Sequence, residues 1–348
     1  MRRIDRLREL LPDNTAVYIT AYPDIFYYSG FQSEDAKLLI SKSKAVIITD
    51  SRYTIQAKEQ APDFEMYDIK NGLEGAFSLV AEKNIGYQEE HISAKGLENA
   101  QKAAKNKEFL PMQKEISSLR EIKEKSEIDR IRAAESLGDD AFSYILERIS
   151  AGRSEREIAL ELEFYMRKNG ASGLSFETIV ASGARSAMPH GVASGKLIEK
   201  GDLVTLDFGC VLDGYCSDMT RTVAVGELSE KGRLIYETVR VAQQTALDAV
   251  KVGAKLADVD KVARDIITNA GFGENFGHSL GHSVGIEIHE TPCFSPKAEG
   301  VVQNGNVITV EPGIYIEGFG GVRIEDLTAV YDSKCEVLSK STKELIIL

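Results

Sequence analysis

The sequence predicts an α+β protein made of two domains, a small α/β domain followed by a larger domain with an internal duplication. Three observations support this prediction. A chain of 348 residues is long enough for about two domains. Its first third alternates short β-rich runs with helical stretches. A pattern of helices and glycines is then repeated within the remainder.

Short aliphatic runs bounded by polar turns characterise the first domain. Three strands and two helices are expected there, over 16–20, 38–40, 45–49, 53–60 and 97–105. A charged segment over 114–125 indicates a solvated connector that leads into a helix. We therefore place the two domains at residues 1–118 and 119–348.

The second domain is expected to begin with a long helix and a second helix that opens with a capping box. In this box the side chains of Ser154 and Glu157 can each satisfy a free backbone N–H. A glycine ends the second helix, and the same arrangement recurs later in the chain. The matching pairs are Leu146 and Leu247, Ile149 and Val250, Gly152 and Gly253, Ile158 and Val259, Tyr165 and Ile266, Met166 and Ile267, and Gly170 and Gly271. We therefore expect two related halves that face each other across a pseudo-twofold axis.

The composition limits the partners and the location of the protein. A net charge of −12 at pH 7 disfavours nucleic acid and anionic membranes as partners. No apolar run approaches the roughly 18 residues of a transmembrane helix, and the charged N-terminus lacks the apolar segment of a signal peptide. The 4 cysteines form neither a C-x-x-C pair nor a disulfide framework. We therefore expect a cytoplasmic protein that binds neither nucleic acid nor membranes.

Histidine is concentrated in the second domain. Of the 5 histidines only His91 lies in the first domain, and the others are His190, His278, His282 and His289. These four lie in or near segments marked by glycine or proline. A single histidine is more often an ordinary core or surface residue, but four in one domain indicate a site.

Two aspartates flank a predicted hairpin turn. Asp213-Gly214 is a strong turn signal, and Asp207 and Asp218 lie on either side of it. Opposed residues in a hairpin with a two-residue loop differ by an odd number, so both carboxylates project from one face, opposite or diagonal to each other. A solvated acidic hairpin is the simpler interpretation, but the strand that carries Asp207 is otherwise largely apolar. Neighbouring carboxylates repel each other unless a proton or a cation lies between them.

Two glutamates lie in similar surroundings. Glu311 ends an apolar strand, and a strand over 321–327 places Arg323 and Glu325 on one face. Either glutamate alone could simply pair with Arg323, but four acids together with imidazoles form an oxygen-rich site. Such a site suits two divalent ions such as manganese or cobalt better than a structural zinc, which prefers thiolates. The residues by themselves predict a dinuclear metallohydrolase that acts on carbonyl or phosphoryl groups.

Five motifs occur in a characteristic order in the second domain. They are Asp207-Phe208-Gly209, Ser217-Asp218-Met219-Thr220, His278-Ser279-Leu280-Gly281-His282, Glu311-Pro312-Gly313-Ile314-Tyr315 and Arg323-Ile324-Glu325-Asp326. In order and spacing they resemble the pita-bread metallopeptidases, in the subgroup of aminopeptidase P and prolidase. The segments 24–31 and 49–53 are similar to the creatinase-type N-terminal domain of this subgroup. The resemblance covers essentially the whole chain and implies a pseudo-twofold pita-bread catalytic domain.

The resemblance also implies a role for each site residue. The metal ligands would be Asp207, Asp218, His282, Glu311 and Glu325. Glu311 would also act as general base, and His289 would stabilise the oxyanion. His190 and His278 would line the substrate subsites together with His289, and both would shuttle protons or contact the proline residue, with His190 among the catalytic residues. Arg323 would hold the ligand geometry from outside the metal centre. The cofactor would be two divalent ions, manganese first, with cobalt or zinc as alternatives.

The function implied by the resemblance is the cleavage of Xaa-Pro bonds. We expect an aminopeptidase that releases the N-terminal residue from peptides with proline in second position. A dipeptidase (prolidase) that acts only on Xaa-Pro dipeptides is the alternative, and loops or a neighbouring subunit would decide between the two. An inactive binding module and a metal-free amidinohydrolase are further alternatives, but all of the ligand positions are filled. The family also implies a homodimer.

Overall fold

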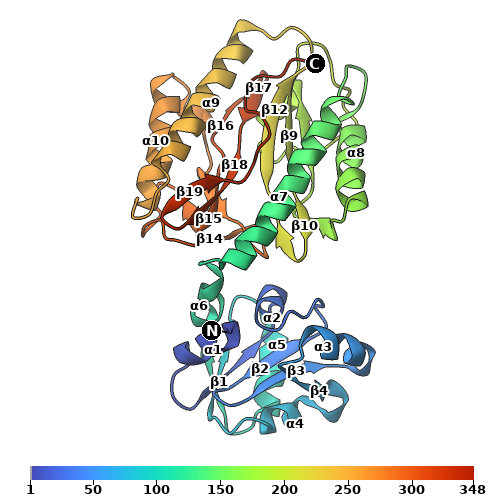
Figure 1. Cartoon of the computed structure of the whole chain (residues 1–348), viewed down its shortest axis with the longest axis vertical. Coiled ribbons are helices and arrows are strands. Elements are labelled where there is room, and N and C mark those ends of the chain that lie inside the picture. Colours follow the sequence, from blue (N-terminus) through green and yellow to red (C-terminus); the bar gives the residue numbers. More distant parts are fainter. Residues whose placement is uncertain (1) are drawn as a thin grey trace. The chain divides into compact units, whose positions relative to one another are not determined.

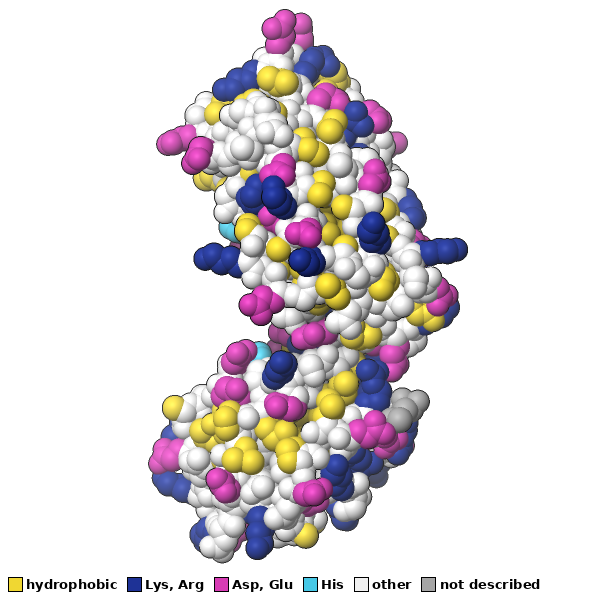
Figure 2. Space-filling view, turned by 90° about the vertical axis from the view of Figure 1, so that its left-hand side faces the viewer, with side chains coloured by type: hydrophobic (Ala, Val, Ile, Leu, Met, Phe, Trp, Pro, Cys, Tyr) yellow, Lys and Arg dark blue, Asp and Glu magenta, His cyan; other side chains and the backbone are white. Residues whose placement is uncertain are grey.

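The computed structural model describes residues 2–348 and divides into two compact units, Met1–Arg120 and Glu121–Leu348 (Figure 1). Helices and strands are present in both units, so the predicted α+β class is confirmed. On the face shown in Figure 2, acidic and basic side chains are interspersed, as is usual for a solvated surface. Among the residues from 2 onward, no helix combines the length and the apolar character needed to cross a membrane.

The first unit is built on a six-stranded mixed sheet. Its elements are α1 (Arg3–Leu10), β1 (Thr15–Ile19), α2 (Tyr22–Ser29), β2 (Lys37–Ile40), β3 (Ala45–Thr49), the 3₁₀ helix η1 (Ser51–Tyr53), α3 (Thr54–Gln60), β4 (Glu65–Asp68), η2 (Ile69–Asn71), α4 (Leu73–Ser78), β5 (Asn84–Tyr87), α5 (Ala94–Ala103), β6 (Glu108–Pro111), α6 (Gln113–Ser117) and η3 (Ser118–Arg120). The strand order is β4-β3-β2-β1-β5-β6. The three strands predicted from the sequence are β1, β2 and β3, and the two predicted helices are α3 and α5. Helix α5 begins earlier than predicted, at Ala94, because the Ser93 side chain accepts the backbone N–H of Gly96 and caps the helix.

The second unit consists of two halves, each with a pair of helices packed on an antiparallel sheet (Figure 1). The first half contains α7 (Lys125–Leu146), α8 (Glu155–Lys168), β7 (Gly173–Leu174), β8 (Ile179–Ser182), η4 (Gly183–Ala187), β9 (Leu203–Phe208), β10 (Cys210–Leu212), β11 (Tyr215–Cys216) and β12 (Met219–Ala224). The second half contains α9 (Glu230–Ala249), α10 (Leu256–Asn269), η5 (Gly273–Asn275), β13 (Gly281–Ser283), β14 (Glu290–Phe294), β15 (Val307–Val310), β16 (Gly313–Ile316), β17 (Gly320–Arg323), β18 (Asp326–Tyr331) and β19 (Lys334–Val337). The main sheets have the orders β12-β9-β8 and β14-β13-β15-β18-β19.

The turns before α8 and α10 show that the two halves repeat the same local structure. Gly152 and Gly253 adopt positive φ angles of 92° and 83°. The Gly152 N–H donates to Ile198 O, and the Gly253 N–H donates to Val302 O, both at 2.9 Å. Because the same turn and the same bond to a residue about 50 positions further along the chain occur in both halves, the structure supports the predicted duplication.

The first turn of α8 has the predicted capping box. Ser154 Oγ accepts the Glu157 N–H at 3.2 Å, and Glu157 Oε2 accepts the Ser154 N–H at 2.7 Å. The inner face of this helix, at Ile158, Leu162 and Met166, is fully buried. In the second half Lys255 occupies the corresponding position, and its side chain makes no cap. The duplication therefore preserves the buried face of the helix but not its cap.

Candidate metal centre

A pocket of about 480 Å³ lies in the second unit and draws side chains from both halves. All of the site residues predicted from the sequence line it: His190, Asp207, Asp218, His278, His282, His289, Glu311, Arg323 and Glu325. Apolar side chains such as Phe176, Ile179 and Val192 line it as well. A pocket with an apolar lining and a few convergent polar groups is typical of a small-molecule or peptide site.

The register of the hairpin that joins β9 and β12 places two aspartates on one face, Asp207 in β9 and Asp218 just before β12. Thr220 lies directly opposite Asp207 in this antiparallel pair. Asp218 precedes Thr220 by two positions, so it lies diagonally across from Asp207 on the same face. The turn at Asp213-Gly214 has positive φ at both residues, 49° and 80°, as the hairpin signal predicts. The predicted common face of the two carboxylates is confirmed.

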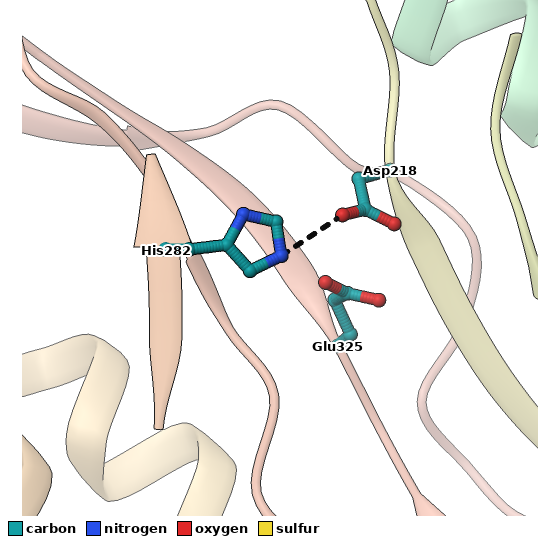
Figure 3. Close-up of side chains that lie close together, drawn as sticks. All are labelled: Asp218, His282 and Glu325. Atoms are coloured by element: carbon teal, nitrogen blue, oxygen red, sulfur yellow. Dashed lines mark ion pairs between the residues drawn. The ribbon is translucent and has the colours of Figure 1, made fainter. Parts of the chain in front are cut away.

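The ligand-type atoms of Asp218, His282 and Glu325 lie within 4.8 Å of one another. Figure 3 shows that these side chains converge from three different segments of the chain. His282 Nε2 lies 3.4 Å from Asp218 Oδ2 and 3.4 Å from Glu311 Oε1. Four of the five predicted ligands are therefore gathered around one imidazole nitrogen.

Thr309 on β15 connects two of these residues. Its hydroxyl accepts the backbone N–H of His282 at 3.0 Å and donates to Glu311 Oε1 at 3.1 Å. Gly281 permits this close approach of β13 to β15, because a Cβ at that position would collide with the Thr309 carbonyl oxygen. His282 and Glu311 thus have fixed positions relative to each other although they are far apart in sequence.

Glu325 lies at a change of sheet that the sequence analysis did not foresee. The expected single strand over 321–327 is divided into β17, which pairs with β16, and β18, which pairs with β15. At the bend between them the Glu325 N–H donates to Thr220 O at 3.1 Å. Thr220 Oγ1 also donates to Glu325 Oε2 at 2.7 Å. Between the two strands, these bonds to the first half take the place of ladder bonds for Glu325.

Arg323 is the buried cation of the site. Its Nη2 donates to Asp207 Oδ2 at 2.5 Å, and its Nη1 donates to Tyr315 Oη at 2.8 Å. The other carboxylate oxygen, Asp207 Oδ1, is buried and has no hydrogen-bond partner among the described residues. Such an unpartnered buried oxygen is costly unless another group, for example a metal ion, accepts its lone pairs.

Burial and mutual repulsion disfavour the ionised forms of the clustered acids. Burial raises the pKa of Asp218 and of Glu325 well above their usual values, and neighbouring carboxylates raise both further. Burial also raises the pKa of Glu311 to about 7, although Arg323 opposes the rise. Bound cations would relieve this repulsion. Carboxylate oxygens, one imidazole nitrogen and an unpartnered oxygen form a donor set that fits divalent metal ions.

The three other histidines of the pocket have different surroundings. His278 is held at both ring nitrogens, with Nδ1 2.8 Å from Ser279 O and Nε2 2.9 Å from Tyr315 Oη. Burial, together with the charge of Arg323, lowers the pKa of His278 to about 4, so the ring is neutral near pH 7. His289 and His190 are exposed, and the His289 ring centroid lies 4.4 Å from that of His282.

Two buried carboxylates that the sequence analysis missed hold the segments that carry these histidines. Glu155 is fully buried and accepts hydrogen bonds from the backbone and side chains of Ser182 and Ser194 and from Arg185 Nε, at 2.6–3.1 Å. These partners flank the segment that contains His190. These partners are ordinary polar residues 27–39 positions from Glu155 in the sequence, so nothing in the pattern distinguished Glu155 from a solvated helix residue.

Glu290 supports the turn before it. Its Oε1 accepts the backbone N–H groups of Ile286 and Glu287 at 3.1 and 3.2 Å, and its Oε2 lies 2.9 Å from Lys123 Nζ. The Lys123 and Glu290 side chains are 1% and 4% exposed. This buried ion pair therefore anchors Glu290, the residue that directly follows His289.

Comparison with known proteins gives the family. Residues 129–332 match the model described as metallopeptidase family M24. The chain belongs to this family. Residues 3–122 match the creatinase/prolidase N-terminal domain. The family, the pita-bread fold and the enzyme class that the motifs predicted are thus confirmed: the chain is a metallopeptidase, a hydrolase that works with bound metal.

Its relatives are similar over their whole length. A Pyrococcus horikoshii protein named Xaa-Pro dipeptidase is 39% identical, over 99% of this chain and 98% of its own. A solved structure described as Xaa-Pro dipeptidase from Bacillus anthracis is 44% identical and covers 99% of each chain, with a TM-score of 0.96. The X-Pro aminopeptidase structure from Thermotoga maritima is 38% identical and covers 99% of this M24 chain and 100% of its own, with a TM-score of 0.93.

Proposed function

We propose that this M24 metallopeptidase is an Xaa-Pro dipeptidase. The observation that carries the proposal is the 44% identity, over 99% of both chains, with the Xaa-Pro dipeptidase structure from Bacillus anthracis. The two Pyrococcus relatives at 39% identity bear the same name. These comparisons favour the dipeptidase, which was the alternative from the sequence, over the aminopeptidase that we expected first.

Xaa-Pro aminopeptidase is the second candidate. It is supported by the Thermotoga maritima structure, whose TM-score of 0.93 and identity of 38% are only slightly lower. Both candidates share the same chemistry, hydrolysis of a bond to proline. They differ in whether the residue after the scissile bond must carry a free carboxylate.

Five side chains of the pocket are the proposed metal ligands: Asp207, Asp218, His282, Glu311 and Glu325. We favour manganese, with cobalt or zinc as alternatives, because oxygen donors dominate the set. When bound, two divalent ions would supply Lewis-acid activation of the peptide carbonyl and of the attacking water.

The remaining steps belong to residues of the chain. Glu311 accepts the proton of the attacking water, as general base. His289 donates a hydrogen bond to the oxygen that gains negative charge in the tetrahedral intermediate. His190 and His278 line the space for the substrate, and His190 also assists proton transfer. His278 is held by Tyr315 and is neutral, so it offers a fixed and uncharged contact.

The substrate preference has a physical basis. The Xaa-Pro bond is a tertiary amide without an N–H, so a peptidase cannot hold it through that donor. A site that acts on the carbonyl does not need the donor. The apolar lining at Phe176, Ile179 and Val192 provides surface for the side chain of Xaa or for the proline ring.

The test compares Leu-Pro with Leu-Pro-Gly after loading the protein with manganese. A dipeptidase should cleave Leu-Pro at least about tenfold more efficiently in kcat/KM, a difference of about 1.4 kcal/mol. Preference for Leu-Pro-Gly would instead support the aminopeptidase. Leu-Gly serves as the control substrate and Glu311→Gln as the inactive control protein. Absence of cleavage of both proline peptides would contradict both candidates.

The metal and the oligomeric state need separate measurements. We propose that activity lost on chelation returns most fully with manganese rather than with cobalt or zinc. We also propose a homodimer, which light scattering coupled to size-exclusion chromatography would detect as twice the chain mass of 38.2 kDa. A monomer of full activity would contradict the second proposal.

A further inference from the structure

A buried carboxylate of helix α7 lies directly behind the predicted ligand Asp218. Glu135 is 0% exposed and does not line the pocket described above. Its Oε2 accepts the backbone N–H of Asp218 at 3.1 Å, and its Oε1 accepts the hydroxyl of Ser339 at 2.6 Å. Glu135 therefore contacts the main chain of a ligand residue from outside the metal centre.

The backbone of Asp218 needs such a partner because it lies between two strands. β11 ends at Cys216 and β12 begins at Met219, so the intervening residues are outside both ladders. Ser217 still bonds across the hairpin, where its N–H donates to Cys210 O at 2.9 Å. The Asp218 N–H is satisfied instead by a side chain from a helix. Because aspartate has a short side chain, a small rotation of its backbone moves its carboxylate.

We propose that Glu135 is a positioning residue of the metal centre, which fixes the Asp218 carboxylate by holding the Asp218 main chain. The inference rests on Asp218 being a metal ligand, as proposed above. Ser339 completes the arrangement, since its hydroxyl holds the second oxygen of Glu135 and so orients the carboxyl group toward Asp218.

The two hydrogen bonds of Glu135 define what a substitution must keep. An apolar side chain of similar size would fill the buried space but would leave the Asp218 N–H and the Ser339 hydroxyl without this partner. Glutamine can also accept the Asp218 N–H and donate to Ser339, so positioning requires the hydrogen bonds rather than the charge.

Asp139 offers a matched control one helical turn further along α7. Its carboxylate accepts the backbone N–H groups of Lys340 and Ser341 at 2.8 and 2.7 Å and the Ser341 hydroxyl at 2.6 Å. Asp139 thus holds the same C-terminal segment as Glu135, but none of these hydrogen bonds reaches a predicted ligand. A purely structural role of Glu135 would be shared by Asp139, whereas a positioning role would not.

The experiment measures Mn²⁺ affinity by calorimetry, the visible absorption spectrum of the Co²⁺ form and thermal unfolding of the metal-free protein. Glu135→Ala and Glu135→Met should weaken Mn²⁺ binding by about 10–100-fold and change the Co²⁺ spectrum. Glu135→Gln can keep both hydrogen bonds, so its Mn²⁺ affinity should remain within about threefold of that of the unsubstituted protein. Asp139→Ala should lower the unfolding temperature and leave both metal readouts unchanged.

Three results would overturn the inference. One is unchanged Mn²⁺ affinity in whichever of Glu135→Ala and Glu135→Met folds. Another is an equal loss of affinity in Asp139→Ala, which would assign the effect to the C-terminal segment. The third is an unsubstituted protein that binds no Mn²⁺, Co²⁺ or Zn²⁺, which would overturn the metal centre itself. Full metal binding without Xaa-Pro cleavage would contradict the proposed substrate but support this inference if the variants behave as expected.

Discussion

Arg323 Nη2 donates a hydrogen bond of 2.5 Å to Asp207 Oδ2. The same guanidinium donates to Tyr315 Oη, which in turn lies 2.9 Å from His278 Nε2. A planar group with donors in fixed directions therefore connects a proposed metal ligand with a proposed substrate contact. It occupies one oxygen of Asp207 and leaves the other, Oδ1, without a protein partner. This geometry explains how a residue outside the ligand set can orient Asp207.

Replacing Arg323 should weaken metal binding. Arg323→Lys keeps the charge, but its single nitrogen cannot replace the two separate nitrogens that reach Tyr315 and Asp207, so these residues lose a common donor. We expect Mn²⁺ affinity and kcat/KM to fall by about 10–100-fold. Calorimetry and the Leu-Pro assay measure these effects. Arg132→Lys, in a surface ion pair with Glu336, is the control and should change neither. Unchanged affinity in Arg323→Lys would contradict the role proposed for this residue.

Removal of metal should destabilise the second unit. The clustered acids repel one another when no cation is bound, and metal at 100 times its dissociation constant would stabilise the fold by about 2.7 kcal/mol. For a unit of this size that corresponds to a decrease in Tm of roughly 5–10 °C on chelation. Differential scanning calorimetry with and without EDTA, followed by addition of Mn²⁺, tests this prediction. Glu325→Gln should reduce the shift, and an equal Tm with and without EDTA would argue against the site.

His289 should act on the rate of the chemical step. If it stabilises the oxyanion, His289→Ala lowers kcat by about 10²–10³ with little change in KM, since the interaction strengthens only in the transition state. Mn²⁺ affinity should stay the same because His289 is not in the proposed ligand set. His91→Ala, at an exposed histidine of the first unit, is the control. A change in KM alone would show that His289 only binds substrate.

Glu155 should make the second unit sensitive to acid. Burial tends to raise the pKa of Glu155, but hydrogen bonds from Ser194 and Ser182 outweigh it and lower the pKa below its ordinary value of 4.5. A carboxylate with a lowered pKa in the folded state stabilises the fold above pH 4.5, and this contribution is lost as the pH falls through the folded-state pKa.

Glu155→Gln tests this dependence on pH. The variant should be less stable than the unsubstituted protein by about 2–3 kcal/mol at pH 7, since hydrogen bonds to a charged group are lost. The difference should shrink below pH 4.5, as urea unfolding at several pH values would measure. Because the segment that contains His190 is held by these bonds, we also expect a higher KM for Leu-Pro. A stability difference that is independent of pH would contradict the argument.

Local patterns were sufficient for much of the fold. The strands β1 to β3 and the capping box of α8 follow from residue types over a few neighbouring positions. The common face of Asp207 and Asp218 follows from the turn at Asp213-Gly214, because one turn sets the register of a whole hairpin. The motifs identified the family because the order and spacing of the acids and histidines are properties of the chain itself.

Hydrogen bonds between segments that are distant in the sequence could not be predicted in this way. The bend at Glu325 depends on Thr220, and the position of the Asp218 backbone depends on Glu135 and Ser339. In each case the partner is an ordinary polar residue whose neighbours in sequence give no signal. Its role arises only when two segments more than 80 residues apart are brought into contact.

The sequence by itself determined the α+β class, the duplicated second domain, the family and the set of side chains that meet in one pocket. Only the tertiary structure decided which oxygens of these side chains are free and which are held, such as Asp207 Oδ1 and Oδ2. The physical reason is that residue type and periodicity determine which face a side chain occupies. The direction of its polar atoms depends on hydrogen bonds from segments that folding brings together.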